Sequence, residues 1–200
     1  MKKLLVILIL VGLLIWGVGV IRDRVTLDDG IIRLHVVGKS DSQQDQDIKL
    51  KVRDAVLDCI NSVMEQLPDQ ETAKAYLLEK LPEIEEVCNR VLASVGETAT
   101  ATVTMIQEKF PTRYYDTFSL PAGVYESLRI TIGEGEGQNW WCVVFPRLCV
   151  ASTSEGMEDT AVGAGFSKPL SGAMTGQAQY KIRFLVLDCL GWLENLLYRS

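Results

Sequence analysis

The chain begins with an apolar run that only a membrane or a deep core can accept. Residues 4–21 contain no charged side chain, and Lys2 and Lys3 directly precede them. Eighteen residues in a helix span about 27 Å, which is close to the thickness of a bilayer core. A positive flank keeps the start of the chain in the cytoplasm and directs the rest across the membrane. The sequence therefore predicts that the rest of the chain is exported.

Two forms of this segment stay open, a signal peptide that is removed and a membrane anchor that is kept. Gly17 and Gly19 are small residues at the spacing that a cleavage site requires. The run is nevertheless longer than the apolar core of about 7–15 residues that signal peptides carry. We assign residues 1–21 to a signal peptide or anchor without choosing between them.

The remainder has the composition of one folded, acidic domain. Hydrophobic residues make up 48% of the chain, which is enough to build a core. We assign residues 22–30 to a polar linker and residues 31–200 to a single extracytoplasmic domain. Residues 1–21 hold two lysines and no acid, so their removal would take the net charge from −6 to −8. Such a domain repels phosphates, and we expect no nucleic-acid partner.

Residue periodicity predicts an α+β fold. Ile32, Leu34 and Val36 alternate with Arg33 and His35, which is the pattern of a half-buried strand. Asp41 or Ser42 can cap the next helix, with Asp45 three residues beyond Ser42 as in a capping box. Helical spacing then predicts helices within residues 43–95, kinked or divided at a proline, and a C-terminal helix over residues 179–198.

The second half of the chain has the pattern of a sheet. Runs with strand character are separated by glycine-rich turns, which predict antiparallel hairpins. The runs cover residues 98–105, 113–120, 124–132 and 139–145. We expect a mostly antiparallel sheet of about four or five strands, packed with the helices. Residues 151–176 are rich in small residues and predict an extended loop.

No residue pattern predicts catalysis, a metal or a cofactor. His35 is the only histidine, and neither Cys142 nor Cys149 has the setting of a nucleophile. A zinc site needs several closely spaced ligands, and the chain offers no such set. The run Gly133-x-Gly135-x-Gly137 carries two glutamates and precedes a strand. It therefore predicts a turn and not a phosphate loop.

The five cysteines divide into two groups. Cys142 and Cys149 flank a proline that can turn the chain, so either a disulfide or two buried thiols fits them. Cys59, Cys88 and Cys189 lie in helical apolar patterns and predict small core residues.

One long run is specific enough to suggest a family. The segment Asn139-Trp-Trp-Cys-Val-Val-Phe-Pro-Arg-Leu-Cys149, with Arg33-Leu-His-Val-Val-Gly-Lys-Ser-Asp41, closely resembles stage II sporulation protein R. The resemblance implies a protein exported from the forespore into the space between forespore and mother cell. It also implies that the protein triggers a membrane-embedded aspartic protease, stage II sporulation protein GA, which then processes pro-sigma-E. The family is a signal and supplies no catalytic residues.

The resemblance names no contact residues, so we select candidates by their chemistry. The segments 38–46, 111–123 and 133–141 carry polar, Gly, Pro and aromatic residues, although each could also serve only to shape a turn. The candidate partner-binding residues are Arg33, His35, Ser40, Asp41, Glu134, Glu136, Asn139, Trp140 and Trp141. Two alternatives from other classes are an exported cell-wall hydrolase and an adhesion module.

Overall fold

The chain folds into two compact units. The computed structural model describes residues 2–148 and 154–198. The sheet unit comprises Gly30–Glu108 and Tyr125–Ser152, and the helical unit comprises Met1–Asp29, Lys109–Val124 and Thr153–Ser200. The single extracytoplasmic domain over residues 31–200 stays a prediction, and residues of this span contribute to both units. Local patterning cannot reveal the division, because two ten-residue strands contribute residues to both units.

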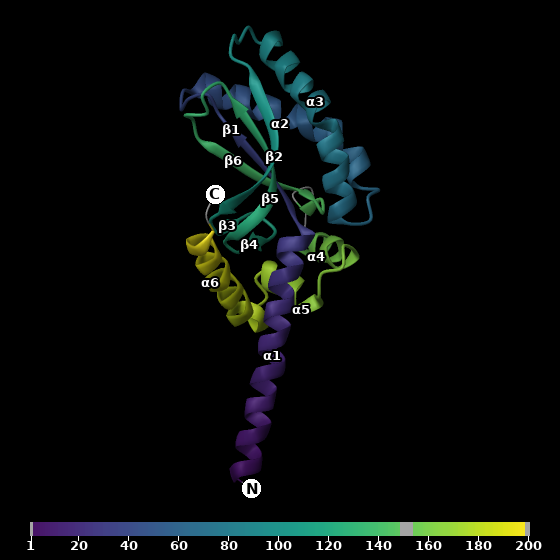
Figure 1. Cartoon of the computed structure of the whole chain (residues 1–200), viewed down its shortest axis with the longest axis vertical. Helices are drawn as coiled ribbons and strands as arrows, with labels where there is room; N and C mark the ends of the chain where they lie inside the picture. Colours follow the sequence, from purple (N-terminus) through teal and green to yellow (C-terminus); the bar gives the residue numbers. More distant parts are fainter. Residues whose placement is uncertain (1, 149–153, 199–200) are drawn as a thin grey trace. The chain divides into compact units, whose positions relative to one another are not determined.

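The sheet unit is built around a mixed four-stranded sheet. Its strands are β1 (Ile32–Val37), β2 (Ala101–Phe110), β5 (Gly123–Ile132) and β6 (Asn139–Phe145). Their order is β2-β5-β1-β6, with β1 parallel to β5 and antiparallel to β6 (Figure 1). The predicted α+β class is confirmed. Sequence periodicity did not indicate that two of the strands, β1 and β5, pair in parallel.

The glycine-rich turn between β5 and β6 does not close a hairpin, and that prediction is wrong. Strand β1 lies between the two strands that the turn connects. All six residues of β1 are buried, and buried backbone groups need hydrogen-bond partners. A neighbouring strand on each edge supplies them. Residues 133–138 therefore form a connection that passes the end of β1.

Two long helices cover one face of this sheet. Helix α2 (Gln43–Met64) begins at Ser42, whose Oγ accepts a hydrogen bond from Asp45 N at 3.2 Å, so the predicted cap is confirmed. Helix α3 (Gln70–Ser94) continues through Pro82, so the predicted division there is wrong and the alternative of a kink stays a prediction. The core between helices and sheet includes alternate strand residues and one side of each helix. Among them are Leu34, Val36, Val52, Ile60, Leu77, Ile84, Leu128 and Ile130.

The helical unit gathers around helix α1 (Lys2–Gly30). The unit also holds β3 (Arg113–Tyr114) paired with β4 (Ser119–Leu120), a 3-10 turn η2 (Ala178–Tyr180), and three further helices. These helices are α4 (Ser154–Gly163), α5 (Lys168–Met174) and α6 (Lys181–Leu197). The predicted C-terminal helix is confirmed. The extended loop predicted over residues 151–176 is wrong for α4 and α5, which are helical.

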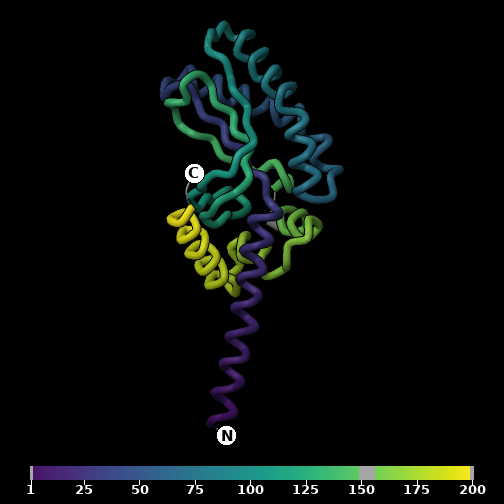
Figure 2. The backbone as a smooth tube through the Cα atoms, viewed as in Figure 1, coloured from purple at the N-terminus to yellow at the C-terminus, as the bar shows by residue number. Residues whose placement is uncertain are grey.

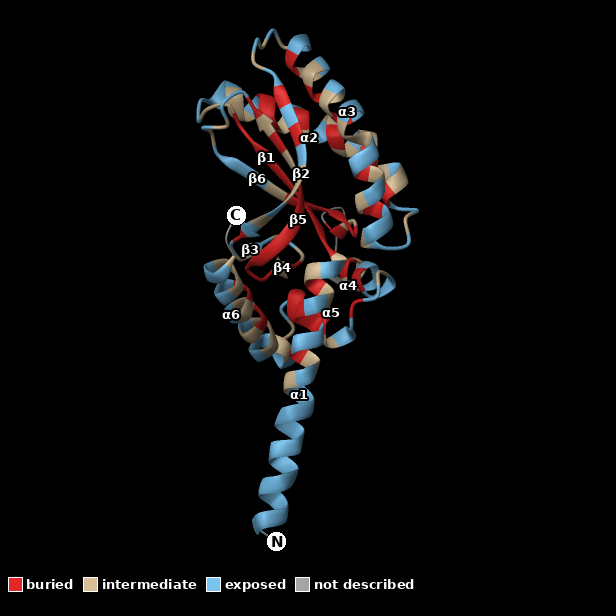
Figure 3. Ribbon diagram, in the orientation of Figure 1, coloured by how far each residue is buried: buried red, intermediate tan, exposed pale blue. Residues whose placement is uncertain are grey.

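Helix α1 has two halves with different surroundings. Its first half projects from the helical unit as a single uninterrupted helix, and its apolar side chains are exposed (Figures 2 and 3). The helix is long and apolar enough to cross a membrane, a criterion that a cleaved signal sequence also meets. Its last turns bury Leu27 and the side chains of Asp23 and Arg24. Residues 22–30, predicted as a polar linker, form the last turns of this helix.

Candidate functional site

A polar network lies on the sheet face opposite α2 and α3. His35 points to this face because it alternates with the core residues of β1. Its Nδ1 lies 3.0 Å from the carboxylate of Glu108 on β2, and its Nε2 lies 2.9 Å from Asn139 Oδ1 on β6. The imidazole also stacks on Trp141, with 5.6 Å between ring centroids. Four side chains distant in sequence are thereby held together.

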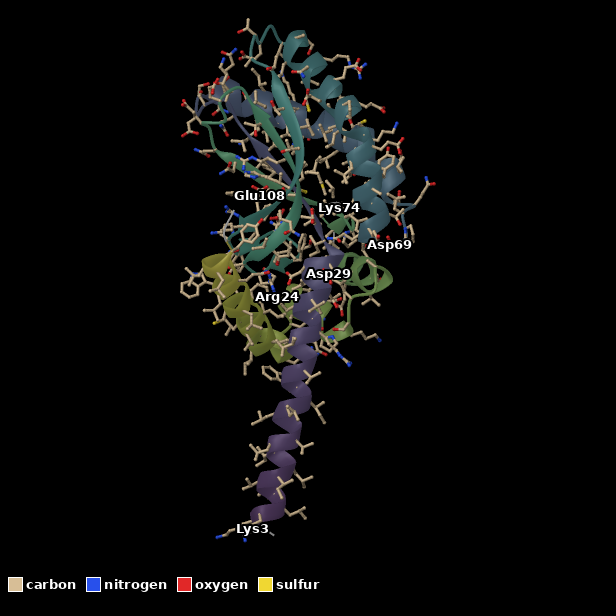
Figure 4. All side chains as sticks on the ribbon, in the orientation of Figure 1. Lys3, Arg24, Asp29, Asp69, Lys74 and Glu108 are labelled. Carbon is tan, nitrogen blue, oxygen red and sulfur yellow. The ribbon has the colours of Figure 1, made fainter. Side chains whose placement is uncertain are left out.

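Glu108 (labelled in Figure 4) is the electrostatic centre of this network. Arg129 Nη1 lies 3.2 Å from its carboxylate. Burial alone would raise the pKa of Glu108. Hydrogen bonds from His35 and Ser127 and the charges of His35 and Arg129 outweigh burial, so the pKa lies below the ordinary value of 4.5. The folded chain therefore favours an ionised carboxylate at this position.

Arg33 occupies the same face but is fully buried. Its Nε donates a hydrogen bond to Cys142 O at 3.2 Å, and its guanidinium lies 5.4 Å from the centroid of the Tyr125 ring. His35 is 7% exposed. These positions suit a role in holding the sheet together. The predicted partner-binding role of Arg33 and His35 stays a prediction, and it would require both side chains to be uncovered.

Two of the three predicted surface segments meet at one corner of the sheet unit. The amide of Gly137 donates to Gly38 O at 2.8 Å, and the amide of Gln138 donates to Asp41 Oδ1 at 2.8 Å. Segments 38–46 and 133–141 therefore form one continuous surface. The third segment, 111–123, belongs to the helical unit.

Lys49 of α2 contacts this corner, and no sequence pattern described above indicated that role. Its Nζ donates to Gln138 O at 2.9 Å and to Gln46 Oε1 at 2.5 Å. Burial lowers the pKa of Lys49, partly opposed by the negative charge of Asp41. The signal that could have found Lys49 is its spacing of three residues before the buried Val52, which puts both on one helix face.

The three glycines of the connection are explained by its own shape. Gly133 and Gly135 have φ values of 58° and 67°, a region that L side chains rarely adopt. A Cβ on Gly137 would lie 2.4 Å from Ser40 O. What approaches the backbone here is therefore the chain's own 38–41 loop, so the glycines no longer argue for an outside partner.

The acidic side chains of the connection remain available at the surface. Glu134 and Glu136 are exposed and line a groove of about 500 Å³ together with Lys39, Ser40, Gly133 and residues 98–100. The Nζ of Lys39 lies 2.9 Å from Glu97 Oε1, which satisfies its charge. We call Ser40, Asp41, Glu134, Glu136 and Trp140 the corner surface. It is mainly acidic.

The two adjacent tryptophans point to opposite faces of β6, as strand geometry predicts. Trp141 stacks on His35, whereas Trp140 lies under the guanidinium of Arg53 on α2, 4.3 Å from the ring centroid. Trp140 is 37% exposed. The register pairs Val37 with Asn139, which puts Trp140 at the end of the sheet where the corner surface lies.

Cysteine and metal chemistry add little to this surface. Cys142 is buried within β6, and Cys149 lies outside the described residues, so the disulfide stays a prediction. Cys189 is exposed, which corrects the prediction of a core residue, while Cys88 is buried as expected. Within residues 2–148 and 154–198, no group of three His, Cys, Asp or Glu side chains is arranged to hold a metal ion.

Comparison with known proteins gives two concordant matches. The family model described as stage II sporulation protein R matches residues 28–155. A curated protein of that name from Bacillus subtilis (strain 168) is 36% identical over 167 residues, which covers 78% of this chain and 75% of the relative. No solved structure matches the chain. The family match includes every residue of the corner surface.

Proposed function

Because the chain belongs to the stage II sporulation protein R family, we propose that it is an exported signal that triggers a membrane-embedded protease during sporulation. The protease is the aspartic protease of the mother cell, stage II sporulation protein GA. Its substrate is pro-sigma-E, so the signal couples forespore and mother-cell gene expression. The observation that carries the proposal is the family match, and the sporulation role follows from it directly.

The N-terminal helix supports the exported location. Residues 4–21 form the exposed apolar half of α1, which a bilayer can accept with its hydrogen bonds satisfied internally. Lys2 and Lys3 keep the start of the chain in the forespore cytoplasm. The two folded units would then stand in the space between the forespore and the mother cell.

The corner surface supports binding to a protein partner. A signal of this kind must bind the active state of its receptor better than the resting state. Glu134 and Glu136 are exposed acidic groups that can steer association with a basic patch. Trp140, partly exposed on the following strand β6, has the chemistry of an interface anchor. We propose that the corner surface contacts the protease.

Reconstitution tests the proposal directly. The full chain is expressed with the protease and pro-sigma-E in a cell that lacks the rest of the pathway, and processing is followed by immunoblot. We expect cleavage of pro-sigma-E only when all three are present. Absence of cleavage, with all three proteins at normal levels, would refute the triggering role.

Charge reversal tests the corner surface in the same assay. Glu134→Lys with Glu136→Lys should reduce processing because it replaces the acidic surface with a basic one. Glu79→Lys with Glu86→Lys is the matched control, since both residues are exposed on α3 and the change in net charge is equal. Equal processing by the two double variants would remove the corner surface from the proposal without affecting the triggering role.

The hydrolase alternative makes an opposite prediction. Purified protein should show no hydrolysis of peptides or peptidoglycan if it acts only as a signal. Turnover that disappears in His35→Ala but persists in Glu134→Gln would favour an enzyme built on the His35 network. An adhesion module would bind the opposing membrane without changing the processing of pro-sigma-E.

A further inference from the structure

Helix α6 exposes an apolar stripe. Its members are separated by three, seven and four residues, so they lie along one side of the helix. Their exposed fractions are 69% for Ile182, 65% for Leu185, 57% for Trp192 and 62% for Leu196. A contiguous apolar surface of this kind marks contact with another protein or with a membrane.

The inward side of α6 combines the buried Leu187 and Gly191 with several polar contacts. Asp188 accepts hydrogen bonds from Thr112 Oγ1 at 2.5 Å and Ala122 N at 2.7 Å. Asn195 Nδ2 donates to Phe110 O at 2.9 Å, and Glu194 pairs with Arg24 of α1. A helix on a water-soluble surface packs its apolar side inward, whereas α6 buries only part of its apolar surface and leaves the stripe exposed. The outer side of α6 is therefore suited to apolar surroundings.

Helix α6 begins beside α1 at the end of its apolar run. Arg183 Nε lies 2.5 Å from Asp23 Oδ2, and a Cβ on Gly19 would lie 3.3 Å from Arg183 Nη2. With residues 4–21 across the bilayer core, Asp23 stands at the boundary with the headgroups. The first residues of the stripe, Ile182 and Leu185, then start at the level of the membrane surface.

The charge of the helical unit is compatible with this position. With Lys2 and Lys3 in the cytoplasm, its exported part holds eight basic and nine acidic side chains, whereas the segments of the sheet unit hold ten basic and seventeen acidic ones. Anionic headgroups therefore repel the sheet unit strongly and the helical unit hardly at all.

We propose that the apolar stripe of α6 rests on the lipid surface of the membrane that α1 enters, with Ile182 and Leu185 deepest. The contact adds a second membrane attachment beside α1 and does not depend on the protease. A coiled coil with another helix is disfavoured, because the stripe extends over only about two heptads and coiled coils need about three or four.

Tryptophan fluorescence tests the contact in the full chain, reconstituted into nanodiscs that carry brominated acyl chains. The Trp16→Phe variant lacks the tryptophan within the apolar run of α1, and all other substitutions are made in it. Brominated lipid should quench part of the remaining emission, and that quenched part should disappear when Trp192→Phe is added. If quenching is the same with and without Trp192, the proposal is overturned.

Substitutions within the stripe provide the second arm. Ile182→Asn with Leu185→Asn should lower the quenching of Trp192 by lipid, because amide side chains favour water. The matched control is Leu78→Asn with Val162→Asn, which changes two exposed apolar residues on other helices and should leave quenching unaltered. Two results would contradict the proposal. One is that aqueous iodide quenches Trp192 whereas brominated lipid does not. The other is that neither quencher reaches Trp192 and that this protection increases with the protein-to-lipid ratio. That result would mean that the stripe contacts a second copy of the chain.

Discussion

His35 Nδ1 on β1 lies 3.0 Å from the carboxylate of Glu108 on β2, although β5 separates the two strands. The contact crosses the face of β5 at Arg129, which is paired in register with His35. One charge network therefore ties three strands together. Its strength should depend on pH, because its central carboxylate has a lowered pKa.

The first prediction concerns the acid limb of stability. Because Glu108 has a lower pKa folded than unfolded, its contribution to the free energy of unfolding is complete above about pH 4.5 and lost as the pH falls through the folded pKa. Glu108→Gln should lower stability near neutral pH by about 1–3 kcal/mol, the usual worth of a hydrogen bond to a charged group. Thermal unfolding between acidic and neutral pH measures the difference, which should shrink in acid. Glu134→Gln, at an exposed site, should change little at any pH.

The second prediction concerns the close packing of α6. A Cβ on Gly191 would lie 1.6 Å from Ala122 O, so Gly191→Ala must push the helix away from the chain beside it. Overpacking of this kind costs about 1–3 kcal/mol. Denaturant unfolding should therefore show a loss of stability. Gly163→Ala is the matched control, because its Cβ would meet no atom within 4 Å. Equal stabilities of the two variants would contradict the close contact.

The third prediction concerns the apolar half of α1. Leu8→Asp with Ile9→Lys should prevent export and processing of pro-sigma-E, because each charge costs about 2.5–3.5 kcal/mol at the bilayer centre. Fractionation of sporulating cells and an immunoblot for sigma-E processing measure both effects. Leu8→Ala with Ile9→Ala keeps the segment uncharged and should behave normally. Normal signalling by the charged variant would rule out the proposed topology.

The fourth prediction concerns the thiols. Cys142 is buried, and burial raises the pKa of Cys88 to about 12, so both should resist alkylation in the folded chain. The disulfide between Cys142 and Cys149 must therefore be tested after unfolding in urea. We expect mass spectrometry to show alkylation of Cys88 without reductant, and of Cys142 and Cys149 only with it. Alkylation of all three without reductant would exclude the bridge.

Patterns close in sequence predicted local structure well. The Ser42 cap and the apolar spacing along α2 identified the helix, because both depend on residues within a few positions of one another. The alternation around His35 identified strand β1, but the predicted half-buried strand is wrong, because all six residues of β1 are buried. Pro82 was another exception. Proline lacks a backbone N–H and removes one helical hydrogen bond, yet α3 continues through it.

The candidate site was predicted only in pieces. Ser40, Asp41, Glu134 and Glu136 were identified by their chemistry, and the structure brings them to one corner. The role of Lys49 was missed, because its partner Gln138 is 89 positions away. Arg33 gave no sign that it would be fully buried, because a strand residue can be covered or exposed depending on what packs against its face.

By itself the sequence determined the membrane-length segment 4–21, the α+β content and the family, since these depend on composition, short-range spacing and long matching runs. Only the tertiary structure decided that β1 separates β5 from β6, because strand pairing joins residues whose distance along the chain carries no local signal. It also decided which side of α6 is covered. Apolar spacing identifies a helix face, but the inward contacts of Asp188 and Asn195 leave Ile182 and Leu185 outside. Burial belongs to the assembled fold, so the elements that pack together determine which face of each helix meets solvent or lipid.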